Sequence, residues 1–336
     1  MSLKVGVIGA GRIGKLHAEN LVYRVPDTEV IAIADVNKAA AEETAKRLKI
    51  PAATGRYQDI LENPAIEAVL ICSSTDTHSQ LIEESAAAGK HIFCEKPIDF
   101  DLKRIDRALK AVEKAGVKLQ IGFNRRFDPN FRHVQEQVAA GKIGEPAILR
   151  ITSRDPAPPP IEYVKVSGGI FLDMTIHDFD MARFLIDSDV VEVYAVGGVT
   201  VDPAIGQAGD VDTVVITLKF ANGVIGTIDN CRRASYGYDQ RVEVFGSAGC
   251  LVAANNTPHN VTLSNGDAVI NAKPLYFFLE RYNESFIEEM RQFVAAVTQN
   301  KPLPVTGRDG LIPVMMGLAA KKSLSEGRPV KLSEIS

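Results

Sequence analysis

The amino-acid sequence predicts an α/β protein: an N-terminal doubly wound parallel sheet, followed by an α+β domain with an open, mainly antiparallel sheet. Three observations predict this organisation. Strand and helix signals alternate through residues 1–122, a glycine-rich turn follows the first strand, and after Phe123 most segments are strands joined by tight turns. We therefore expect two domains, residues 1–122 and 123–336, in line with roughly 150 residues per domain.

In the first domain, short apolar runs alternate with amphipathic segments. The predicted strands are residues 3–8, 30–34, 68–72, 91–94 and 118–123. The predicted helices are residues 12–24, 38–48, 78–88 and 102–115. Strands separated by helices imply right-handed crossovers, which place helices on both faces of a parallel sheet.

The second domain is predicted from hairpin signals. Residues 213–220 alternate in polarity, turn at Asn222-Gly223 and return over 224–228, which is typical of an antiparallel hairpin. Further strands are predicted at 241–245, 251–252 and 261–263, with helices at 130–140, 174–185, 285–298 and 309–326. The C-terminal helices could pack back on the first domain.

The composition argues against several classes of protein. A net charge of −4 and a pI near 5.9, with scattered Lys and Arg, argue against nucleic-acid or anionic-membrane binding. No apolar run approaches the ~18 residues that span a bilayer, and the N-terminus begins a strand without a signal segment. The four cysteines lack C-x-x-C spacing, so we expect free thiols and a cytoplasmic protein.

The turn after the first strand has the pattern G-x-G-x-x-G, formed by Gly9, Gly11 and Gly14 around Arg12 and Ile13. It follows a strand and opens a helix, as the dinucleotide-binding Rossmann motif requires. Its glycines permit a tight turn, close approach of a pyrophosphate and close helix–strand packing. The helix N-terminus offers free N–H groups to the phosphates. The alternative is a structural glycine turn without a ligand.

Asp35 ends the second predicted strand, at the distance from the glycines where a carboxylate binds the ribose hydroxyls. Its charge would repel the 2′-phosphate of NADP, and no arginine follows to receive that phosphate. These features predict NAD as the cofactor. The alternative is that Asp35 only caps a helix.

Lys96, in the segment Glu95-Lys96-Pro97, follows the fourth predicted strand. Ligands of open parallel sheets bind at the carboxyl ends of the strands, so Lys96 is expected to face the nicotinamide. Pro97 restricts the backbone of Lys96 to extended conformations. A lone lysine after a strand can also be a solvated charge.

Asp173 and His177 are four residues apart at the start of a predicted helix, which places them on one face. The pair could act as a general base and its partner, or as a helix cap and a core histidine. A metal site is conceivable because Asp178 and Asp180 are near. No metal is predicted, because residues 173, 178 and 180 cannot all face one ion from one helix.

These motifs resemble the glucose–fructose oxidoreductase/inositol dehydrogenase/rhizopine catabolism family. The resemblance rests on the glycine turn at 9–14, the segment AGKHIFCEKP at 88–97 and the Asp173/His177 pair, and it extends over nearly the whole chain. The segments 122–128 and 236–240 support it. The family resemblance implies a Rossmann domain, an open-sheet domain that often builds tetramers, and an NAD-dependent oxidoreductase acting on CH–OH groups.

The resemblance also assigns roles to individual residues. It makes Lys96, Asp173 and His177 the catalytic group, with the same three residues contacting substrate. It implies further polyol contacts at Arg126, Asp155 and Tyr236, although the loop Pro156–Pro160 departs from the expected pattern. Additional cofactor contacts are expected at Thr75, His78, Glu95 and Lys96.

The expected reaction is oxidation of a ring hydroxyl of a cyclic polyol, with myo-inositol and its 2-keto product as the leading pair. In this hypothesis His177 takes the hydroxyl proton, Asp173 orients the imidazole, and Lys96 donates to the same oxygen. The alternatives are another sugar, a sugar acid or scyllo-inositol as substrate, or a non-catalytic NAD-sensing regulator. The intact catalytic group favours an enzyme.

We also expect a homo-oligomer, by resemblance a tetramer. Along residues 213–220, Val214, Ile216 and Leu218 form an apolar face and the alternate residues a mixed one. A sheet face not covered by helices would leave an apolar patch, which usually marks an interface.

Overall fold

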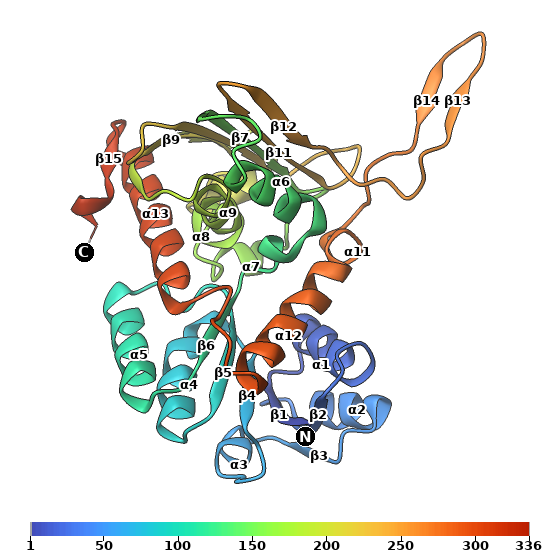
Figure 1. Ribbon diagram of the computed structural model, residues 1–336, viewed down its shortest axis with the longest axis vertical. Coiled ribbons are helices and arrows are strands. Elements are labelled where there is room, and N and C mark those ends of the chain that lie inside the picture. The colour runs from blue at the N-terminus through green and yellow to red at the C-terminus, as the bar shows by residue number, and fades with distance from the viewer. Residues whose placement is uncertain (1, 336) are drawn as a thin grey trace. The chain divides into compact units, whose positions relative to one another are not determined.

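The computed structural model describes residues 2–335, which divide into two compact units (Figure 1). The first unit runs to Asn124 and also includes Glu284–Val314. The second comprises Arg125–Asn283 and the chain from Met315 onward. Each unit has its own sheet.

The first unit contains a six-stranded parallel sheet in the order β3-β2-β1-β4-β5-β6. Its strands are β1 (Leu3–Ile8), β2 (Thr28–Ala34), β3 (Ala52–Thr54), β4 (Ala68–Ile71), β5 (His91–Glu95) and β6 (Leu119–Gly122). The chain fills one half of the sheet from β1 to β3 and then crosses to β4 to fill the other half. The predicted doubly wound Rossmann sheet is therefore confirmed, with its topological switch point between β1 and β4.

Helices complete the core of this unit. They are α1 (Arg12–Tyr23), α2 (Lys38–Leu48), α3 (Gln58–Leu61), α4 (Thr75–Ala87), α5 (Leu102–Ala115) and α12 (Asn283–Thr298). Helix α12 is distant in sequence, yet its buried Met290 and Phe293 join the same core as Val5 and Val7 of β1. Burial of these apolar side chains stabilises the unit, at roughly 25 cal/mol per Å² of apolar surface removed from water.

The second unit contains a seven-stranded sheet in the order β12-β11-β7-β10-β9-β8-β15. Its strands are β7 (Pro146–Arg154), β8 (Val190–Gly198), β9 (Thr213–Phe220), β10 (Ile225–Cys231), β11 (Asp239–Gly246), β12 (Gly249–Ala253) and β15 (Val330–Lys331). β7 and β10 pair in parallel, whereas the other neighbours pair antiparallel. The prediction of a mainly antiparallel sheet is confirmed.

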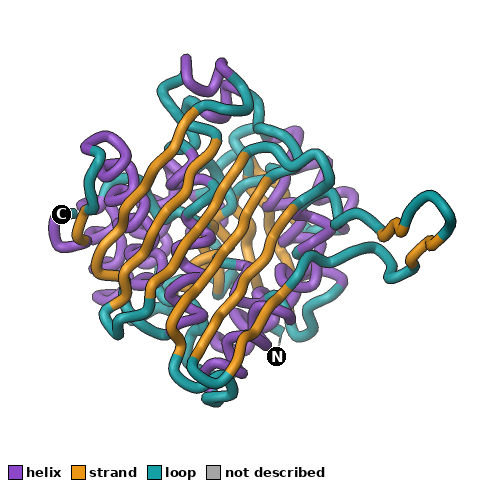
Figure 2. Tube along the Cα trace, turned by 90° about the horizontal axis from the view of Figure 1, so that it is seen from above, coloured by secondary structure: helices purple, strands orange, loops and turns teal. Residues whose placement is uncertain are grey.

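Helices cover one face of this sheet and leave the other open (Figure 2). The helical elements are η1 (Asn124–Phe127), α6 (Pro129–Ala139), α7 (Ile161–Val164), α8 (Ile170–Asp173), α9 (Ile176–Ile186), α10 (Pro203–Gln207), α11 (Phe278–Arg281), η2 (Leu332–Glu334), and α13 (Gly307–Glu326), which runs from the first unit into the second. The apolar stripe Val214, Ile216 and Leu218 is buried, and the mixed stripe of β9 is exposed.

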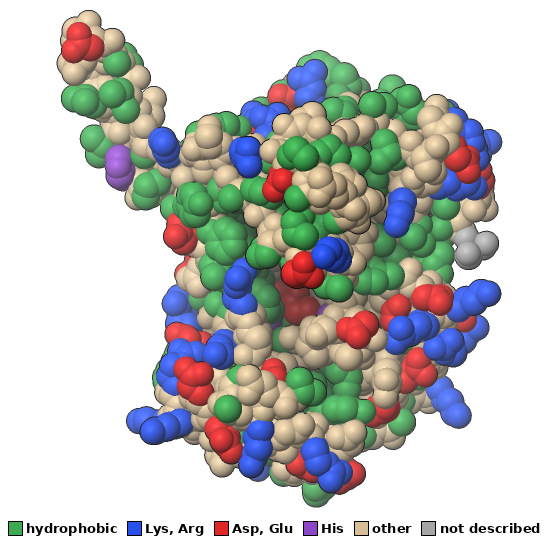
Figure 3. Space-filling view, turned by 180° about the vertical axis from the view of Figure 1, so that it is seen from behind, with side chains coloured by type: hydrophobic (Ala, Val, Ile, Leu, Met, Phe, Trp, Pro, Cys, Tyr) green, Lys and Arg blue, Asp and Glu red, His purple; other side chains and the backbone are tan. Residues whose placement is uncertain are grey.

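A two-stranded hairpin, β13 (Thr262–Ser264) and β14 (Val269–Asn271), extends from the second unit (Figures 2 and 3). Its hydrophobic side chains Val261, Leu263, Val269 and Ile270 are all more than half exposed. Across the described residues, every helix is too short or too polar to cross a bilayer.

Candidate active site

The glycine turn after β1 has the geometry that the sequence pattern predicts. Gly9 has a φ of +105°, and a Cβ there would lie 2.5 Å from the carbonyl oxygen of Cys72. A Cβ at Gly14 would collide with the carbonyl oxygen of Gly9. A Cβ at Gly11 would meet no described atom within 4 Å, so the space at the N-cap of α1 is open. The fold itself requires Gly9 and Gly14, whereas Gly11 leaves room for a phosphate beside the free N–H groups of the helix.

Asp35 stands beside this turn, immediately after β2. One carboxylate oxygen accepts a 2.6 Å hydrogen bond from the backbone N–H of Ala10, and the other accepts one of 2.8 Å from Asn37. Asp35 therefore joins the glycine turn to the end of β2. Its charge lies at the carboxyl edge of the sheet, where the ribose of a dinucleotide binds.

His78, a predicted cofactor contact, lies in the interior of the first unit. Its side chain is only 2% exposed, with Nδ1 2.8 Å from the carbonyl oxygen of Pro97 and Nε2 3.1 Å from that of Ser73. Both ring nitrogens thus face backbone oxygens of two loops, and the residue links α4 to the loop after β5. Thr75 is half-buried at the first position of α4 and remains a predicted contact.

Lys96 follows β5 directly, at the carboxyl edge of the sheet, and its side chain is half-buried. The Lys96–Pro97 peptide bond is cis. Glu95, a predicted cofactor contact, is the last residue of β5. One of its carboxylate oxygens accepts a 2.7 Å hydrogen bond from Nε2 of the buried His17. Glu95 therefore contacts the interior of the first unit.

Asp173 ends the short helix α8, and α9 begins at Ile176, so Asp173 and His177 do not share one continuous helix as predicted. The Asp173 carboxylate has partners that the sequence did not suggest. The hydroxyl of Tyr163 donates to one oxygen at 2.8 Å, and both terminal nitrogens of Arg232 lie 3.2 Å from the other. These donors compensate the charge of Asp173 and hold its orientation.

Arg232 is the centre of a carboxylate cluster in the second unit. The parallel strands β7 and β10 end side by side, so Asp155 and Arg232, which follow them, emerge together. The fully buried guanidinium lies 3.2 Å from Asp173, 3.9 Å from Asp155 and 4.0 Å from Asp210. One cation therefore serves three carboxylates.

Burial changes the titration of two carboxylates of this cluster, Asp155 and Asp210. Burial raises the pKa of Asp155 to about 6; Arg232 opposes the shift, and Asp173 adds to it. Burial also raises the pKa of Asp210, although the backbone N–H of Ile170 hydrogen-bonds its carboxylate and opposes the change. The cluster can therefore hold a proton near neutral pH.

A buried polar network supports the start of α9, where His177 lies. Arg125 and Asp178 form a 2.6 Å ion pair, and Asn230 donates to the other oxygen of Asp178 at 2.8 Å. Thr175 donates to Asn230 at 2.6 Å. Burial raises the pKa of Asp178, and Arg125 opposes that shift. These bonds fix the backbone on both sides of His177.

Two of the predicted polyol contacts have other partners. The guanidinium of Arg126 forms a bidentate pair with Asp180, at 2.9 Å from Nε and 2.6 Å from Nη2, so these two nitrogens bind a carboxylate of its own unit. The hydroxyl of Tyr236 donates to Asp239 at 2.5 Å and accepts from Arg154 at 3.3 Å, while the side chain is 39% exposed. Two acids that follow His177 in the sequence were considered as metal ligands. Asp178 is paired with Arg125, and Asp180 is paired with Arg126.

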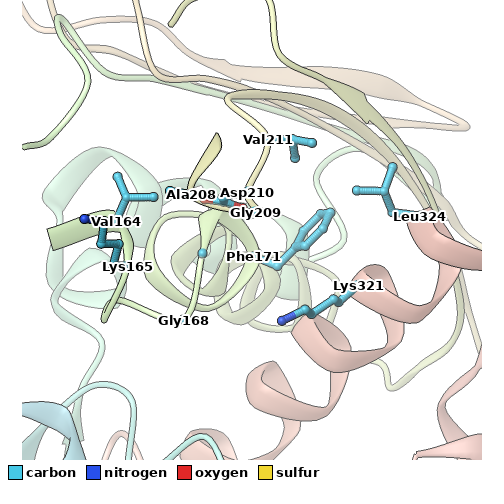
Figure 4. Close-up of a pocket in the computed structure, with 11 residues that line it drawn as sticks. Val164, Lys165, Gly168, Phe171, Ala208, Gly209, Asp210, Val211, Lys321 and Leu324 are labelled. Carbon is cyan, nitrogen blue, oxygen red and sulfur yellow. The ribbon is translucent and has the colours of Figure 1, made fainter. Parts of the chain in front are cut away.

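A cavity of about 260 Å³ opens next to the carboxylate cluster (Figure 4). Its walls include Lys165, Gly169, Phe171, Asp210, Lys321 and Leu324. Because Asp210 lies in the wall, the cavity reaches the side of the cluster that is formed by Asp210.

Sequence reasoning missed Arg232, Tyr163 and Asp210. The position of Arg232 directly after a strand was a usable signal, since loops after strand ends often carry function. Arg232 lies beside Asp155 only because β7 and β10 pair in parallel. The turn residues next to these strands did not indicate that pairing. Tyr163 lies in the four-residue helix α7 and Asp210 in an irregular segment, and neither segment has a periodic pattern.

Taken together, the parallel sheet, the open glycine turn and the polar cluster define a dinucleotide-dependent oxidoreductase. Residues 3–123 match the oxidoreductase family with an NAD-binding Rossmann fold, and residues 131–252 match the GFO/IDH/MocA C-terminal domain. The chain belongs to the GFO/IDH/MocA family of NAD-binding oxidoreductases.

Several relatives are similar over their full length. The chain is 51% identical to myo-inositol 2-dehydrogenase of Thermotoga maritima, over 99% of each chain. It is 46% identical to inositol 2-dehydrogenase of Rhizobium meliloti, over 99% of this chain and 100% of the relative. Its structure matches scyllo-inositol dehydrogenase from Lactobacillus casei, solved with bound NAD(H) and scyllo-inositol, with a TM-score of 0.93 and 30% identity over 99% of this chain and 100% of the other.

Proposed function

We propose that this protein oxidises myo-inositol to its 2-keto product with NAD as the hydride acceptor. The observation that carries the proposal is full-length similarity to proteins named inositol 2-dehydrogenase. In this proposal residues 1–122 bind the dinucleotide, and residues 123–336 bind the polyol and form the contacts between subunits.

The residues of the first unit suit the cofactor. Gly9, Gly11 and Gly14 leave the helix N-terminus open to a pyrophosphate, and Arg12 and Ile13 begin that helix. Asp35 would accept hydrogen bonds from the ribose hydroxyls, and Thr75 would supply a further contact. Bound NAD provides an electron-poor ring that accepts hydride, which is chemistry no side chain offers.

The chain's own residues move the proton. Neutral His177 accepts the proton of the reacting hydroxyl, and Asp173 orients the imidazole and stabilises its charged form. Lys96 donates a hydrogen bond to the oxygen as negative charge develops on it. Support for this assignment comes from the donors Arg232 and Tyr163, which fix the carboxylate of Asp173.

The remaining hydroxyls require several polar contacts to select one stereoisomer. Asp155 and Tyr236 are the proposed contacts, because both combine a polar group with partial exposure. Arg126 is assigned to Asp180 instead, and His78 and Glu95 to structural contacts.

A second candidate substrate is scyllo-inositol, which differs from myo-inositol in the configuration of one hydroxyl. The observation that favours it is the similarity to scyllo-inositol dehydrogenase of Lactobacillus casei. The proline-rich loop 156–160 follows the proposed contact Asp155 and so could change which isomer fits.

Two further proposals concern the assembly and its compartment. We propose a homotetramer, because the open sheet face carries two exposed apolar rows: Val196 and Val215 are adjacent in register and 54% and 55% exposed, and Ile225, Ile148 and Phe245 form a second row. We propose a cytoplasmic location, which the four free cysteines support.

The experiment that tests the activity is a substrate panel. Purified protein with NAD is mixed with myo-inositol, scyllo-inositol, aldoses and sugar acids, and NADH absorbance is followed. The proposal expects the highest kcat/KM with myo-inositol. A higher kcat/KM with scyllo-inositol would select the second candidate. If no compound in the panel gave NADH, both candidates would be refuted and a regulator would be favoured.

A further inference from the structure

A buried cluster of His17, Glu95 and Glu289 lies in the first unit, outside the glycine turn. One ligand atom from each residue lies within 4.8 Å of the others. His17 and Glu289 are fully buried, and the side chain of Glu95 is 14% exposed. We propose that His17 is a positioning residue for Lys96 and acts through Glu95. The inference rests on the proposed function, since it assumes that Lys96 assists the reaction.

His17 connects three elements of the fold. It belongs to α1, the helix that begins at the glycine turn, and its Nε2–H donates to Glu95 at the end of β5. Glu289 comes from α12, whose segment returns to the first unit from the C-terminal part of the chain. The cluster therefore joins the cofactor helix to the strand that carries Lys96.

The ring of His17 has a defined orientation. Phe93 packs against it edge to face with ring centres 5.1 Å apart, and Phe286 does the same at 5.7 Å. Such aromatic contacts favour one rotamer of the imidazole. The ring therefore presents Nε2 to Glu95 from a rigid apolar setting.

The carboxylate of Glu95 occupies space that the glycine at position 122 leaves open. Gly122 of β6 pairs with Glu95 across the sheet, and a Cβ at Gly122 would lie 2.9 Å from Oε2 of Glu95. A side chain at position 122 would displace this carboxylate. Gly122 thus provides the room in which Glu95 can turn back to His17.

The electrostatic environment also favours a hydrogen-bond donor next to Glu95. The carboxylates of Glu95 and Glu289 are close together in a buried region, where like charges repel strongly. Burial raises the pKa of the nearby Cys72 thiol, and the charges of Glu95 and Glu289 raise it further. The Nε2–H of His17 donates a hydrogen bond to Glu95 in this setting, which stabilises its carboxylate.

The consequence falls on Lys96, which follows Glu95 by a single peptide bond. The hydrogen bond from His17, here called the pin, holds the Glu95 side chain. It thereby fixes the last residue of β5 and the backbone from which Lys96 extends. Because a misplacement of about 1 Å can cost 10²-fold in rate, loss of the pin is expected to lower kcat by roughly 10- to 100-fold.

The test uses two substitutions at position 17 whose side chains are similar in length. His17→Gln keeps an N–H donor that can reach Glu95, whereas His17→Met removes it. We expect His17→Met to lower kcat with little change in NAD affinity, and His17→Gln to restore most of the rate. The matched control is Leu21→Ala, one turn further along α1 and fully buried, which should lower Tm and leave kcat unchanged. Equal loss of kcat in the Gln and Met variants would overturn the inference.

A double-mutant cycle separates positioning from a structural effect. If His17 acts through Lys96, His17→Met should slow wild-type protein but not Lys96→Ala protein, because interacting residues are not additive. The same fold-loss in both backgrounds overturns the inference while leaving the proposed function intact.

Hydrogen exchange provides a readout that does not need activity. In the peptide covering residues 91–98, His17→Met should exchange faster than wild type, and His17→Gln and Leu21→Ala should not. If wild-type protein oxidises no polyol, the proposed function fails, and this exchange experiment still decides whether His17 pins β5. Unchanged exchange in His17→Met would contradict the pin.

Discussion

Both terminal nitrogens of Arg232 lie 3.2 Å from the same carboxylate oxygen of Asp173. The other oxygen of Asp173 accepts a hydrogen bond from Tyr163. Asp173 is thereby held by two donors from different segments, which is the condition a carboxylate must meet to orient a catalytic imidazole. Arg232 also lies 3.9 Å from Asp155 and 4.0 Å from Asp210, so three carboxylates share this guanidinium.

The first prediction concerns removal of that guanidinium. Arg232→Met leaves three neighbouring carboxylates without their cation, and loss of one partner of a buried pair costs about 3–5 kcal/mol. The free energy of unfolding in urea should fall by that order, and kcat should fall in the protein that remains folded. The exposed neighbour provides the control: Arg233→Met should leave both quantities unchanged. A fully stable and active Arg232→Met variant would contradict the role given to the cluster.

The second prediction concerns pH. Asp155 has a folded-state pKa of about 6, above the value of about 3.9 in an unfolded chain. As the pH rises between these values, the unfolded chain releases the proton first, so the folded state loses stability. Relative to Asp155→Asn, wild-type protein should lose on the order of 2 kcal/mol of unfolding free energy between about pH 4 and pH 7. Urea titrations across this range measure the difference.

The control for this experiment is Asp267→Asn, which changes an exposed residue in the turn of the β13–β14 hairpin. Its stability should follow that of wild-type protein at every pH. The prediction fails if the unfolding free energy of Asp155→Asn protein changes with pH in the same way as that of wild-type protein over the whole range.

The third prediction concerns cofactor choice. Asp35→Asn removes the charge that repels a 2′-phosphate but keeps an acceptor for the N–H of Ala10. The ratio of kcat/KM for NAD to that for NADP should fall by tenfold or more, a change of about 1.4 kcal/mol. Asp35→Ala also loses the bond to the glycine turn, so it should weaken binding of both cofactors. Wild-type protein that uses NADP as well as NAD would refute the assignment.

The fourth prediction concerns the open face of the second sheet. Val215→Glu introduces a charge beside the exposed Val196, and burying an unpaired charge in an interface is costly. Light scattering should show the proposed tetramer replaced by smaller species, down to the 36.4 kDa chain. Tyr23→Glu, at an exposed position in the first unit, should leave the tetramer intact. Monomeric wild-type protein would exclude the proposed assembly.

Many helices and strands of the first unit could be predicted, because the sequence patterns that indicate them lie within each element. The predicted bounds of β1, α2 and α5 coincide with the structure, since apolar periodicity marks each of them. Strand β3 (Ala52–Thr54) escaped prediction because three small residues carry no periodic pattern. The strands β7 and β8 also lacked bordering hairpin turns, so the extent of the second sheet was underestimated.

The site could be predicted only where a residue follows a strand or a glycine turn, as Lys96 and Asp35 do. Arg232 also follows a strand, but its role, like that of His17, arises from partners distant along the chain. A lone histidine in a helix has the same local pattern whether it packs in a core or holds a carboxylate. For the same reason, the Asp180 partner of Arg126 was not foreseen.

The central claim is that His177 accepts the proton of the polyol. The most direct measurement is the single-turnover rate of NADH formation with myo-inositol in His177→Ala protein, with NAD affinity and Tm determined on the same sample. Loss of the general base predicts a rate lower by ~10²–10⁴-fold with NAD affinity and Tm close to wild type. A near-normal rate in folded His177→Ala protein would contradict the mechanism.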